Sequence, residues 1–180
     1  MQTFTGYLPG ILELGSSIVS DHRGYSVESY NHRLFEEAVG HQITFVQDNE
    51  SYSKRYVLRG LHYQRKCNQG KLVRAVYGEI FDVVVDLRKT SKTFGHWGSV
   101  ILSRVKQNQL WVPPGFAHGF LALTDAVVSY KVTAYHDQAL EVVLRWDDDD
   151  LNIHWLLERA PILSAEDAQG KRFRELEYCE

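Results

Sequence analysis

The 180-residue sequence is poor in residues that mark several protein classes, with two cysteines, four prolines and one methionine. Cys67 lies in a polar stretch and Cys179 stands beside the last residue. Two cysteines placed like this make neither a disulfide framework nor a metal site, so we expect neither to be structural or catalytic. We therefore expect the chain to reside in a reducing cytoplasm.

Long hydrophobic runs and an excess of positive charge are also missing. The longest apolar stretch, residues 80–87, is interrupted by Asp82 and Asp86 and falls far short of the ~20 residues of a membrane span. The N-terminus has no basic start and no long apolar segment, so we expect no signal peptide. The formal net charge of −3 provides no excess of positive charge with which to bind the phosphates of DNA or RNA. We therefore expect neither a membrane nor a nucleic-acid partner.

Hydrophobic residues are plentiful, at 44% of the chain, and aromatic residues make up 12%. A chain of this size buries roughly 70% of its unfolded surface, which allows one domain, residues 1–180, with a real core. Tyr77 and Gly78 predict a tight hairpin turn between two strands. Segments rich in Val, Ile, Tyr and Phe, separated by turn residues, predict strands at 43–47, 57–63, 72–76, 79–87, 100–103, 109–112, 119–123 and 127–135.

Only two helices are predicted. The first begins after Asn31 as N-cap, continues to Val39 and ends at Gly40. The second begins near Ser164, because Ser164 and Asp167 have the spacing of a capping box. Many strands with so few helices indicate an all-β sandwich or barrel.

Two of the eight histidines stand out. His118 lies in Pro-Pro-Gly-Phe-Ala-His-Gly-Phe, residues 113–120, which resembles half of the cupin signature and implies a jelly-roll barrel. Metal-binding cupins also carry a His-x-His pair, but here the earlier strand has His62-Tyr63-Gln64, without the second imidazole. Two histidines with no third ligand fit a transition metal poorly, so we expect no metal and no cofactor.

Charged residues on the predicted strands face either the barrel interior or the solvent. We expect Arg74 and Lys131 to face the solvent, because most charged side chains are exposed. Arg59 and His62 are three residues apart, so on a regular strand they face opposite sides. They can share a pocket only if Gly60 forms a bulge or the strand bends.

A series of short motifs, in order along most of the chain, resembles the dTDP-4-dehydrorhamnose 3,5-epimerase family. The matching segments are residues 21–24, 28–31, 45–49, 57–64, 69–74, 78–83, 86–88, 93–95, 109–120, 130–131, 146–148 and 163–164. The resemblance implies an all-β, cupin-type jelly-roll barrel with a few short helices. It also implies a homodimer in which N-terminal strands pair across subunits, and a place in rhamnose and cell-surface polysaccharide synthesis.

The implied reaction is metal-free inversion, at carbons 3 and 5, of a nucleotide-linked 4-keto-6-deoxyhexose. A proton next to the ketone is removed, an enolate forms, and a proton returns on the other face. Such a site needs a base, an acid opposite it and a positive group near the ketone oxygen. The resemblance assigns His62 as the base, Asp167 as its orienting carboxylate, Tyr130 as the opposing acid and Lys71 as the group near the ketone oxygen.

The resemblance also implies a set of residues that bind the nucleotide and the sugar. Arginine suits a diphosphate because its planar fork gives paired, charge-assisted hydrogen bonds. Amide side chains offer both donors and acceptors to a base or a sugar. The implied binding residues are Arg23, Glu28, Gln47, Asp48, Asn49, Arg59, His118, Tyr135, Glu141 and Glu166.

Three positions depart from the family pattern. Glu166 stands where the family has lysine, His136 replaces the second tyrosine of a Tyr-Tyr pair, and Tyr56 replaces a small residue. These changes permit an epimerase that acts at one carbon only, or on another nucleotide-linked sugar. Ketoisomerases of nucleotide sugars share the implied fold. A non-catalytic sugar-binding cupin module is an alternative of another class, and a metal-dependent cupin oxygenase is a third, disfavoured by Gln64.

Overall fold

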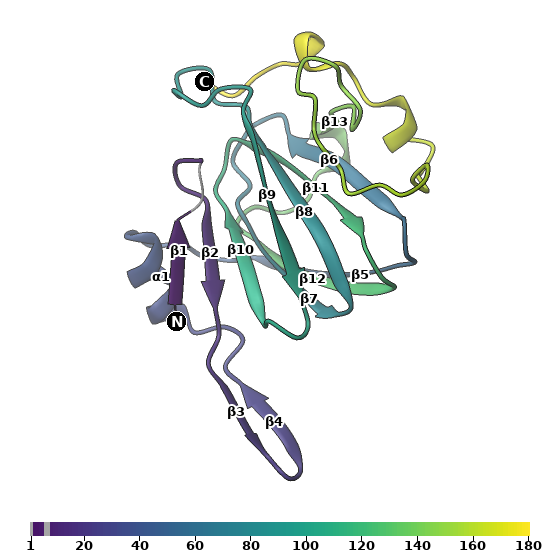
Figure 1. The fold of residues 1–180 in the computed structure, drawn as a ribbon. Coiled ribbons are helices and arrows are strands. Elements are labelled where there is room, and N and C mark those ends of the chain that lie inside the picture. The colour runs from purple at the N-terminus through teal and green to yellow at the C-terminus, as the bar shows by residue number, and fades with distance from the viewer. Residues whose placement is uncertain (1, 6–7) are drawn as a thin grey trace.

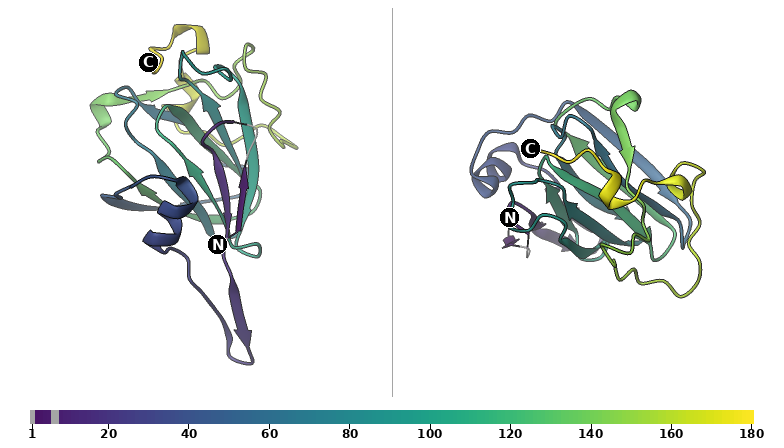
Figure 2. Two further views of the ribbon diagram at one scale, coloured as in Figure 1. Left: turned by 90° about the vertical axis from the view of Figure 1, so that its left-hand side faces the viewer. Right: turned by 90° about the horizontal axis from the view of Figure 1, so that it is seen from above.

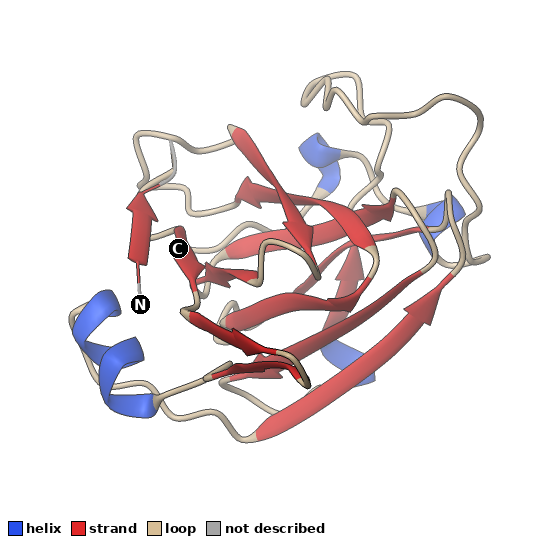
Figure 3. Cartoon of the chain, turned by 60° about the horizontal axis from the view of Figure 1, so that its bottom comes forward, coloured by secondary structure: helices blue, strands red, loops and turns tan. Residues whose placement is uncertain are grey.

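Two antiparallel β-sheets packed face to face form the body of the protein in the computed structural model, which describes residues 2–5 and 8–180 (Figure 1). The first sheet contains, in spatial order, β1 (Gln2–Thr5), β2 (Leu12–Gly15), β10 (Asn108–Val112), β7 (Lys71–Tyr77), β12 (Ala126–Val132) and β5 (Gln47–Ser53). The second contains β13 (Glu141–Val143), β6 (Leu58–Gln64), β11 (Phe116–Ala122), β8 (Glu79–Asp86) and β9 (Trp97–Ser103). The jelly-roll fold expected from the sequence is confirmed, and the helices lie at its periphery (Figure 3).

The core between the sheets follows from the two-residue alternation of side chains along each strand. On β7, Val73 and Ala75 are buried in this core, whereas Arg74 lies on the outer face beside Lys131, as expected. Burial of such aliphatic and aromatic side chains is the main term that holds two sheets together. The other members are Leu8, Ile11, Ile80, Val84, Leu102, Leu110, Val112, Phe116, Phe120, Ala126 and Val128.

A second core covers the outer face of the five-stranded sheet. The segment after β13 crosses this face with little regular structure apart from two short 3₁₀ turns, η2 (Asp167–Gln169) and η3 (Phe173–Glu175). Trp146, Trp155 and Phe173 of this segment pack against buried residues such as Leu61 and Val83. Strand β8 is therefore covered on both faces, which explains its nearly continuous apolar sequence.

The second predicted helix is only the short turn η2. Ser164 does act as a cap, since its Oγ accepts a hydrogen bond from the Asp167 amide at 3.0 Å. The helix does not continue because the chain turns to pair with the edge strand: the Lys171 amide donates to the Val143 carbonyl at 2.9 Å. Gly170 permits this approach, since a Cβ there would lie 2.8 Å from the Arg145 amide nitrogen.

Helix α1 (His32–Val39) and the turn between β7 and β8 agree with the prediction. The Asn31 side chain accepts a hydrogen bond from the Leu34 amide at 3.2 Å, and Gly40 ends the helix with a φ of 86°. The helix packs its buried Phe35 against Trp111 on the outer face of the six-stranded sheet. Gly78 forms the hairpin turn, also with a positive φ of 71°.

A two-stranded arm projects from this body. Strands β3 (Ile18–Asp21) and β4 (Gly24–Val27) pair only with each other in the chain as described, and nearly every residue in them is exposed. Figure 2 shows the arm extending well beyond the sheets. Tyr25 of β4 contacts the body, since the Arg104 guanidinium lies 4.4 Å from the centroid of its ring and Gln107 Nε2 donates to its hydroxyl at 3.3 Å. An isolated two-stranded hairpin is otherwise only marginally stable in water.

Several predicted strand boundaries were wrong. The strand predicted at residues 43–47 is β5, which begins only at Gln47 and continues through a polar sequence to Ser53. Strands β1 to β4 and β13 were missed. Their short or polar sequences lack the apolar alternation on which strand prediction depends.

The expectation for the cysteines was also wrong. Cys67, just after β6, and Cys179 form a disulfide with their Cα atoms 5.7 Å apart. Backbone hydrogen bonds bring Cys179 there, since its amide donates to the Leu87 carbonyl and its carbonyl accepts from the Lys89 amide. The pairing depends on the long-range path of the C-terminal segment, which no local pattern encodes. Among the described residues, no helix is long and apolar enough to span a membrane.

Candidate active site

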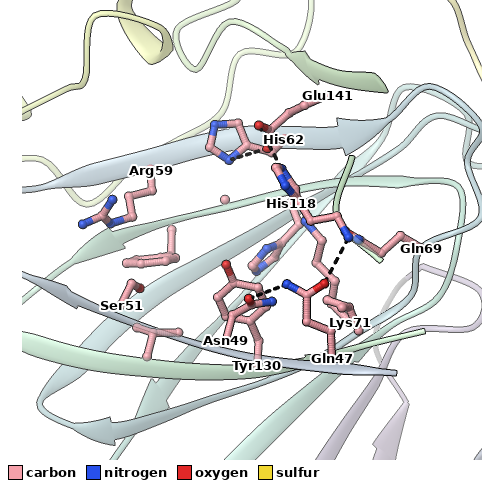
Figure 4. A pocket seen from close by; sticks show the side chains of 15 residues that line it. Gln47, Asn49, Ser51, Arg59, His62, Gln69, Lys71, His118, Tyr130 and Glu141 are labelled. Carbon is pink, nitrogen blue, oxygen red and sulfur yellow. Dashed lines mark hydrogen bonds and ion pairs between the residues drawn. The ribbon is translucent and has the colours of Figure 1, made fainter. Parts of the chain in front are cut away.

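A cavity of about 300 Å³ opens between the two sheets and holds most of the polar side chains that face the barrel interior (Figure 4). This volume is within the usual range for small-molecule sites. The six-stranded sheet contributes Gln47, Asn49, Ser51, Lys71 and Tyr130. The five-stranded sheet contributes Arg59, His62, His118 and Glu141. Phe120 and Val128 belong both to the cavity wall and to the core, so the polar site rests directly on packed apolar residues.

His62 and Asp167 form a hydrogen-bonded pair in the wall formed by the five-stranded sheet. The His62 Nε2 atom lies 2.6 Å from Asp167 Oδ1. The Asp167 side chain is 5% exposed, and Ser164 caps the turn that carries it. A carboxylate can only accept, so Nε2 carries the proton and Nδ1 is the nitrogen with a free lone pair.

A bulge brings Arg59 and His62 to the same side of β6, as the sequence required. The pairing between β6 and β11 shifts register between His118 and Phe120, and Gly60 has a φ of 101°. A Cβ at Gly60 would lie 2.8 Å from the His118 carbonyl oxygen, so only glycine fits. The irregularity allows two residues three positions apart to line one cavity.

Tyr130 faces the cavity from β12, in the sheet opposite His62. Burial, and next the negative charge of Glu141, raise the pKa of its phenol above the ordinary value of 10.0. The hydroxyl is therefore protonated at neutral pH and available as a proton donor.

Lys71, the first residue of β7, places its ammonium group in the same cavity. Burial lowers its pKa to about 8, although the carboxylates of Glu141 and Asp82 oppose this shift. The side chain is still mainly a cation at pH 7. A half-buried cation facing a cavity stabilises negative charge on a bound ligand more strongly than an exposed one.

His118 is held by a carboxylate that the sequence did not indicate as part of the site. Its Nε2 atom lies 2.9 and 3.0 Å from the two oxygens of Asp82, which is fully buried. Asp82 lies in the middle of β8, with apolar residues on both sides of it in the sequence. Such a residue is almost never fully buried without a partner, and that signal could have identified it.

The remaining polar contacts show how the cavity is organised for a ligand. Gln47 Nε2 donates to Asn49 Oδ1 at 2.8 Å, and Arg59 Nε donates to Ser53 Oγ at 2.9 Å. Ser51 and Gln69 also line the cavity and were not predicted. His136, which replaces a tyrosine of the family pattern, lines it as well. Ser51 could have been found, because it continues the inward-facing series of Gln47 and Asn49. Its Oγ is buried and has no hydrogen-bond partner within the described chain.

Five of the predicted binding residues lie outside this cavity in the single chain. Arg23 is at the tip of the arm and pairs with Asp21, and Glu28 follows the arm. Asp48 faces outward, where Lys131 Nζ lies 2.8 Å from its carboxylate, because β5 alternates. Tyr135 and Glu166 are exposed at the edge of the molecule.

Metal-ligating side chains do not converge in the cavity. Among residues 2–5 and 8–180, no three His, Cys, Asp or Glu side chains are grouped so that they could hold a metal ion. Gln64, at the position where a metal-binding cupin has its second imidazole, is buried and its Oε1 accepts a hydrogen bond from the Asp137 amide at 3.3 Å.

Comparison with known proteins agrees with the fold and the cavity. The family model described as dTDP-4-dehydrorhamnose 3,5-epimerase matches residues 5–175. The Pseudomonas aeruginosa dTDP-4-dehydrorhamnose 3,5-epimerase is 50% identical over 167 residues, covering 92% of each chain. The Legionella pneumophila 3,5-epimerase, solved in complex with dTDP-4-keto-L-rhamnose, superimposes with a TM-score of 0.94 at 41% identity, covering 97% of this chain and 94% of that one.

A relative with a narrower activity has the same fold. The 3'-monoepimerase from Streptomyces bikiniensis, solved with dTDP-quinovose, superimposes with a TM-score of 0.87 at 34% identity, covering 92% of this chain and 85% of that one. The fold alone therefore does not determine how many carbons are inverted. The extent of the family-model match and the identity to its members show that this chain belongs to the dTDP-4-dehydrorhamnose 3,5-epimerase family.

Proposed function

We propose that this protein inverts carbons 3 and 5 of a dTDP-linked 4-keto-6-deoxyhexose. One observation carries the proposal: the His62–Asp167 pair and Tyr130 face one cavity from opposite sheets. Inversion next to a ketone needs a base on one face of the sugar and an acid on the other. A protein that only binds the sugar needs no such pair.

The reaction begins with proton removal by His62. Asp167 accepts a hydrogen bond from the Nε2–H group of His62, which keeps that proton. The Nδ1 lone pair takes the proton next to the ketone, and the carboxylate stabilises the resulting imidazolium. The Lys71 ammonium stabilises the negative charge that develops on the ketone oxygen. Tyr130 then donates a proton to the opposite face of the enolate. The His62 imidazolium loses its proton to solvent and the Tyr130 phenolate takes one from solvent before the second carbon reacts. The substrate and product have the same oxidation state, so the reaction requires no redox cofactor.

The nucleotide and diphosphate contact the residues away from this centre. Arg59 offers a charge-assisted donor to the diphosphate, and Gln47 and Asn49 offer amide groups to the sugar or the base. Arg23 and Glu28 do not line the cavity within one chain. The arm that carries Arg23 extends beyond the two sheets (Figure 2).

We propose that the protein is a homodimer and that the arm of one protomer completes the cavity of its partner. The exposed two-stranded arm and its Arg23 support this arrangement. A mixture of Arg23→Ala and His62→Ala proteins tests it. Mixed dimers contain one site with an intact His62 and an intact partner arm, so about a quarter of wild-type activity returns. No recovery, with exchange of protomers verified, contradicts the shared site.

We also propose that residues 1–180 form one catalytic domain that works in the cytoplasm, since a charged nucleotide sugar does not cross a membrane unaided. The Cys67–Cys179 pair makes this testable, because disulfides are rare in that compartment. Thiol alkylation in intact cells should label both cysteines if the location is correct. Protection of both cysteines argues for an oxidising compartment.

The activity is tested by incubation with dTDP-4-keto-6-deoxyglucose in heavy water, followed by NMR of the sugar protons. We expect deuterium at carbons 3 and 5 and inversion of both. Label at one carbon only indicates a single-carbon epimerase, and faster turnover of a GDP-linked analogue indicates another nucleotide. Binding without label contradicts catalysis. The His62→Ala protein, folded by thermal melt, should lose about 10²–10⁴-fold in rate.

A further inference from the structure

Glu141 lies between two imidazoles at the wall of the cavity. Its Oε2 atom lies 3.2 Å from His136 Nε2, which is hydrogen-bond distance. Its Oε1 atom lies 4.0 Å from His62 Nδ1, which is too long for a hydrogen bond. Figure 4 shows the Glu141 carboxylate next to His62. The carboxylate is therefore bonded to one histidine and held just beyond reach of the other.

The distance to His62 matters because of the other contact that this imidazole makes. Its Nε2 is already committed to Asp167 at 2.6 Å. If a second carboxylate bonded Nδ1, the ring would carry protons on both nitrogens, each donating to an anion. An imidazolium held in this way cannot accept a proton from a substrate. A movement of Glu141 by about an ångström is enough to make that second hydrogen bond.

His136 is well placed to prevent this movement. Its backbone amide donates to Gln47 Oε1 at 3.2 Å, which fixes the loop after β12 against β5. Glu141 begins β13 and pairs with Gln64 of β6, so its backbone is fixed and only its side chain can turn. We infer that His136 is a positioning residue, which holds the Glu141 carboxylate away from His62 Nδ1 and so keeps that nitrogen free to accept the substrate's proton.

Other titratable groups near Glu141 and His62 could also affect the position of the Glu141 carboxylate or the protonation of His62. Lys71 of β7 attracts the Glu141 carboxylate, and the Tyr130 hydroxyl of β12 is neutral. Asp167 of η2 contacts His62 on its far side. His118 of β11 and Asp82 of β8 bond to each other. None of these groups donates a hydrogen bond to the Glu141 carboxylate among the interactions of the described residues. His136, in the loop after β12, is the residue that does.

The inference rests on the proposed function, because it takes His62 as the base. It predicts that His136→Phe moves the acidic limb of the kcat/KM pH profile upward by about one to two pH units, the effect of a close opposite charge. At pH 7 the loss is at most about tenfold for a shift of one pH unit and about a hundredfold for two, and it recovers at higher pH. His136→Gln, which keeps a donor, should retain the wild-type profile. The double variant His136→Phe, Glu141→Gln should return the limb to its wild-type position.

The experiment measures both deuterium exchange into dTDP-4-keto-6-deoxyglucose and the pH titration of the His62 ring nitrogens by ¹⁵N NMR. The expected result is an upward shift of both midpoints in His136→Phe, reversed by Glu141→Gln. His136 is 44% exposed, so the variant should fold, and His136→Ala provides a second test. Unchanged midpoints in both variants overturn the inference, whatever happens to KM. If the wild type shows no exchange, the proposed function fails, and the NMR titration still decides whether Glu141 and His136 control the protonation of His62.

Discussion

Replacing Lys71 tests how the buried cation contributes to the reaction. Lys71 lies half-buried in the cavity wall, and burial lowers its pKa from 10.5 to about 8. The ammonium form stabilises the enolate and is present below this pKa, so kcat/KM should fall as the pH rises through about 8. At pH 9 only about a tenth of the lysines remain charged, which corresponds to a roughly tenfold loss relative to pH 7.

The magnitude of the Lys71→Met effect follows from its position. Loss of a preorganised group at a developing oxyanion typically costs about 10²–10³-fold in kcat, or ~2.7–4 kcal/mol. The loss should appear at pH 7, whereas at pH 9.5 the wild type itself is mainly uncharged and the difference should shrink. Lys71→Arg keeps a permanent charge, so it should remove the alkaline limb near pH 8 even if the longer side chain lowers the maximal rate.

The assay is the pH dependence of kcat/KM for deuterium exchange between pH 5 and 10, since kcat/KM reports the free enzyme. Lys106→Met is the matched control. Lys106 is exposed in the turn between β9 and β10. This turn contacts Gly78, which follows the end of β7 opposite to Lys71. If the kcat/KM profile of Lys71→Arg still falls near pH 8 as the wild-type profile does, Lys71 is not the group whose titration causes that fall. Tyr130 does not interfere, because its raised pKa places its titration above 10.

Three further predictions concern stability and ligand affinity. Reduction of Cys67–Cys179, which are 112 residues apart, should lower the free energy of unfolding by about 2–4 kcal/mol, and identical urea curves with and without reductant contradict this. Burial opposes the ionisation of Asp86, but hydrogen bonds from Arg88, Ser91 and Thr93 outweigh it and lower its pKa to about 2. Asp86→Asn should therefore cost ~2 kcal/mol in thermal melts above pH 4, a cost that shrinks between about pH 4 and 2, and a constant difference refutes it. Glu166→Lys should lower KM for the dTDP-sugar about threefold at low salt but not at high salt, and an unchanged KM shows that the exposed side chain has no ligand role.

Local signals account for the parts of the fold that the sequence predicted. Asn31 and Gly40 mark the ends of α1 because capping depends on residues within one turn. The turn at Gly78 is equally local. In contrast, β5 was misplaced because its inward side chains are polar ligand-facing groups, and strand prediction depends on apolar alternation. Functional sites are where such local rules are expected to fail.

The site itself was predicted in part. The resemblance identified eight of the residues that line the cavity, whereas five of the binding residues it implied lie outside it in the single chain. The spacing of Arg59 and His62 correctly required an irregularity at Gly60. Asp82 was missed because its role depends on His118, which is 36 residues away in the sequence. His136 was noted only as a departure from the family pattern, because its contact with Glu141, five residues further on, depends on a loop with no regular pattern. The disulfide was missed for the same reason, since chain topology alone brings its two ends together.

The central claim is that base and acid act from opposite walls of one cavity. It is tested most directly by comparing deuterium exchange with completed inversion in the Tyr130→Phe protein, incubated with dTDP-4-keto-6-deoxyglucose in heavy water. Because His62 and Asp167 are intact there, proton removal and wash-in of label should persist near the wild-type rate. Inversion should fall by about 10²-fold or more, most strongly at carbon 5. Equal losses of exchange and inversion would show that Tyr130 is not the opposing acid.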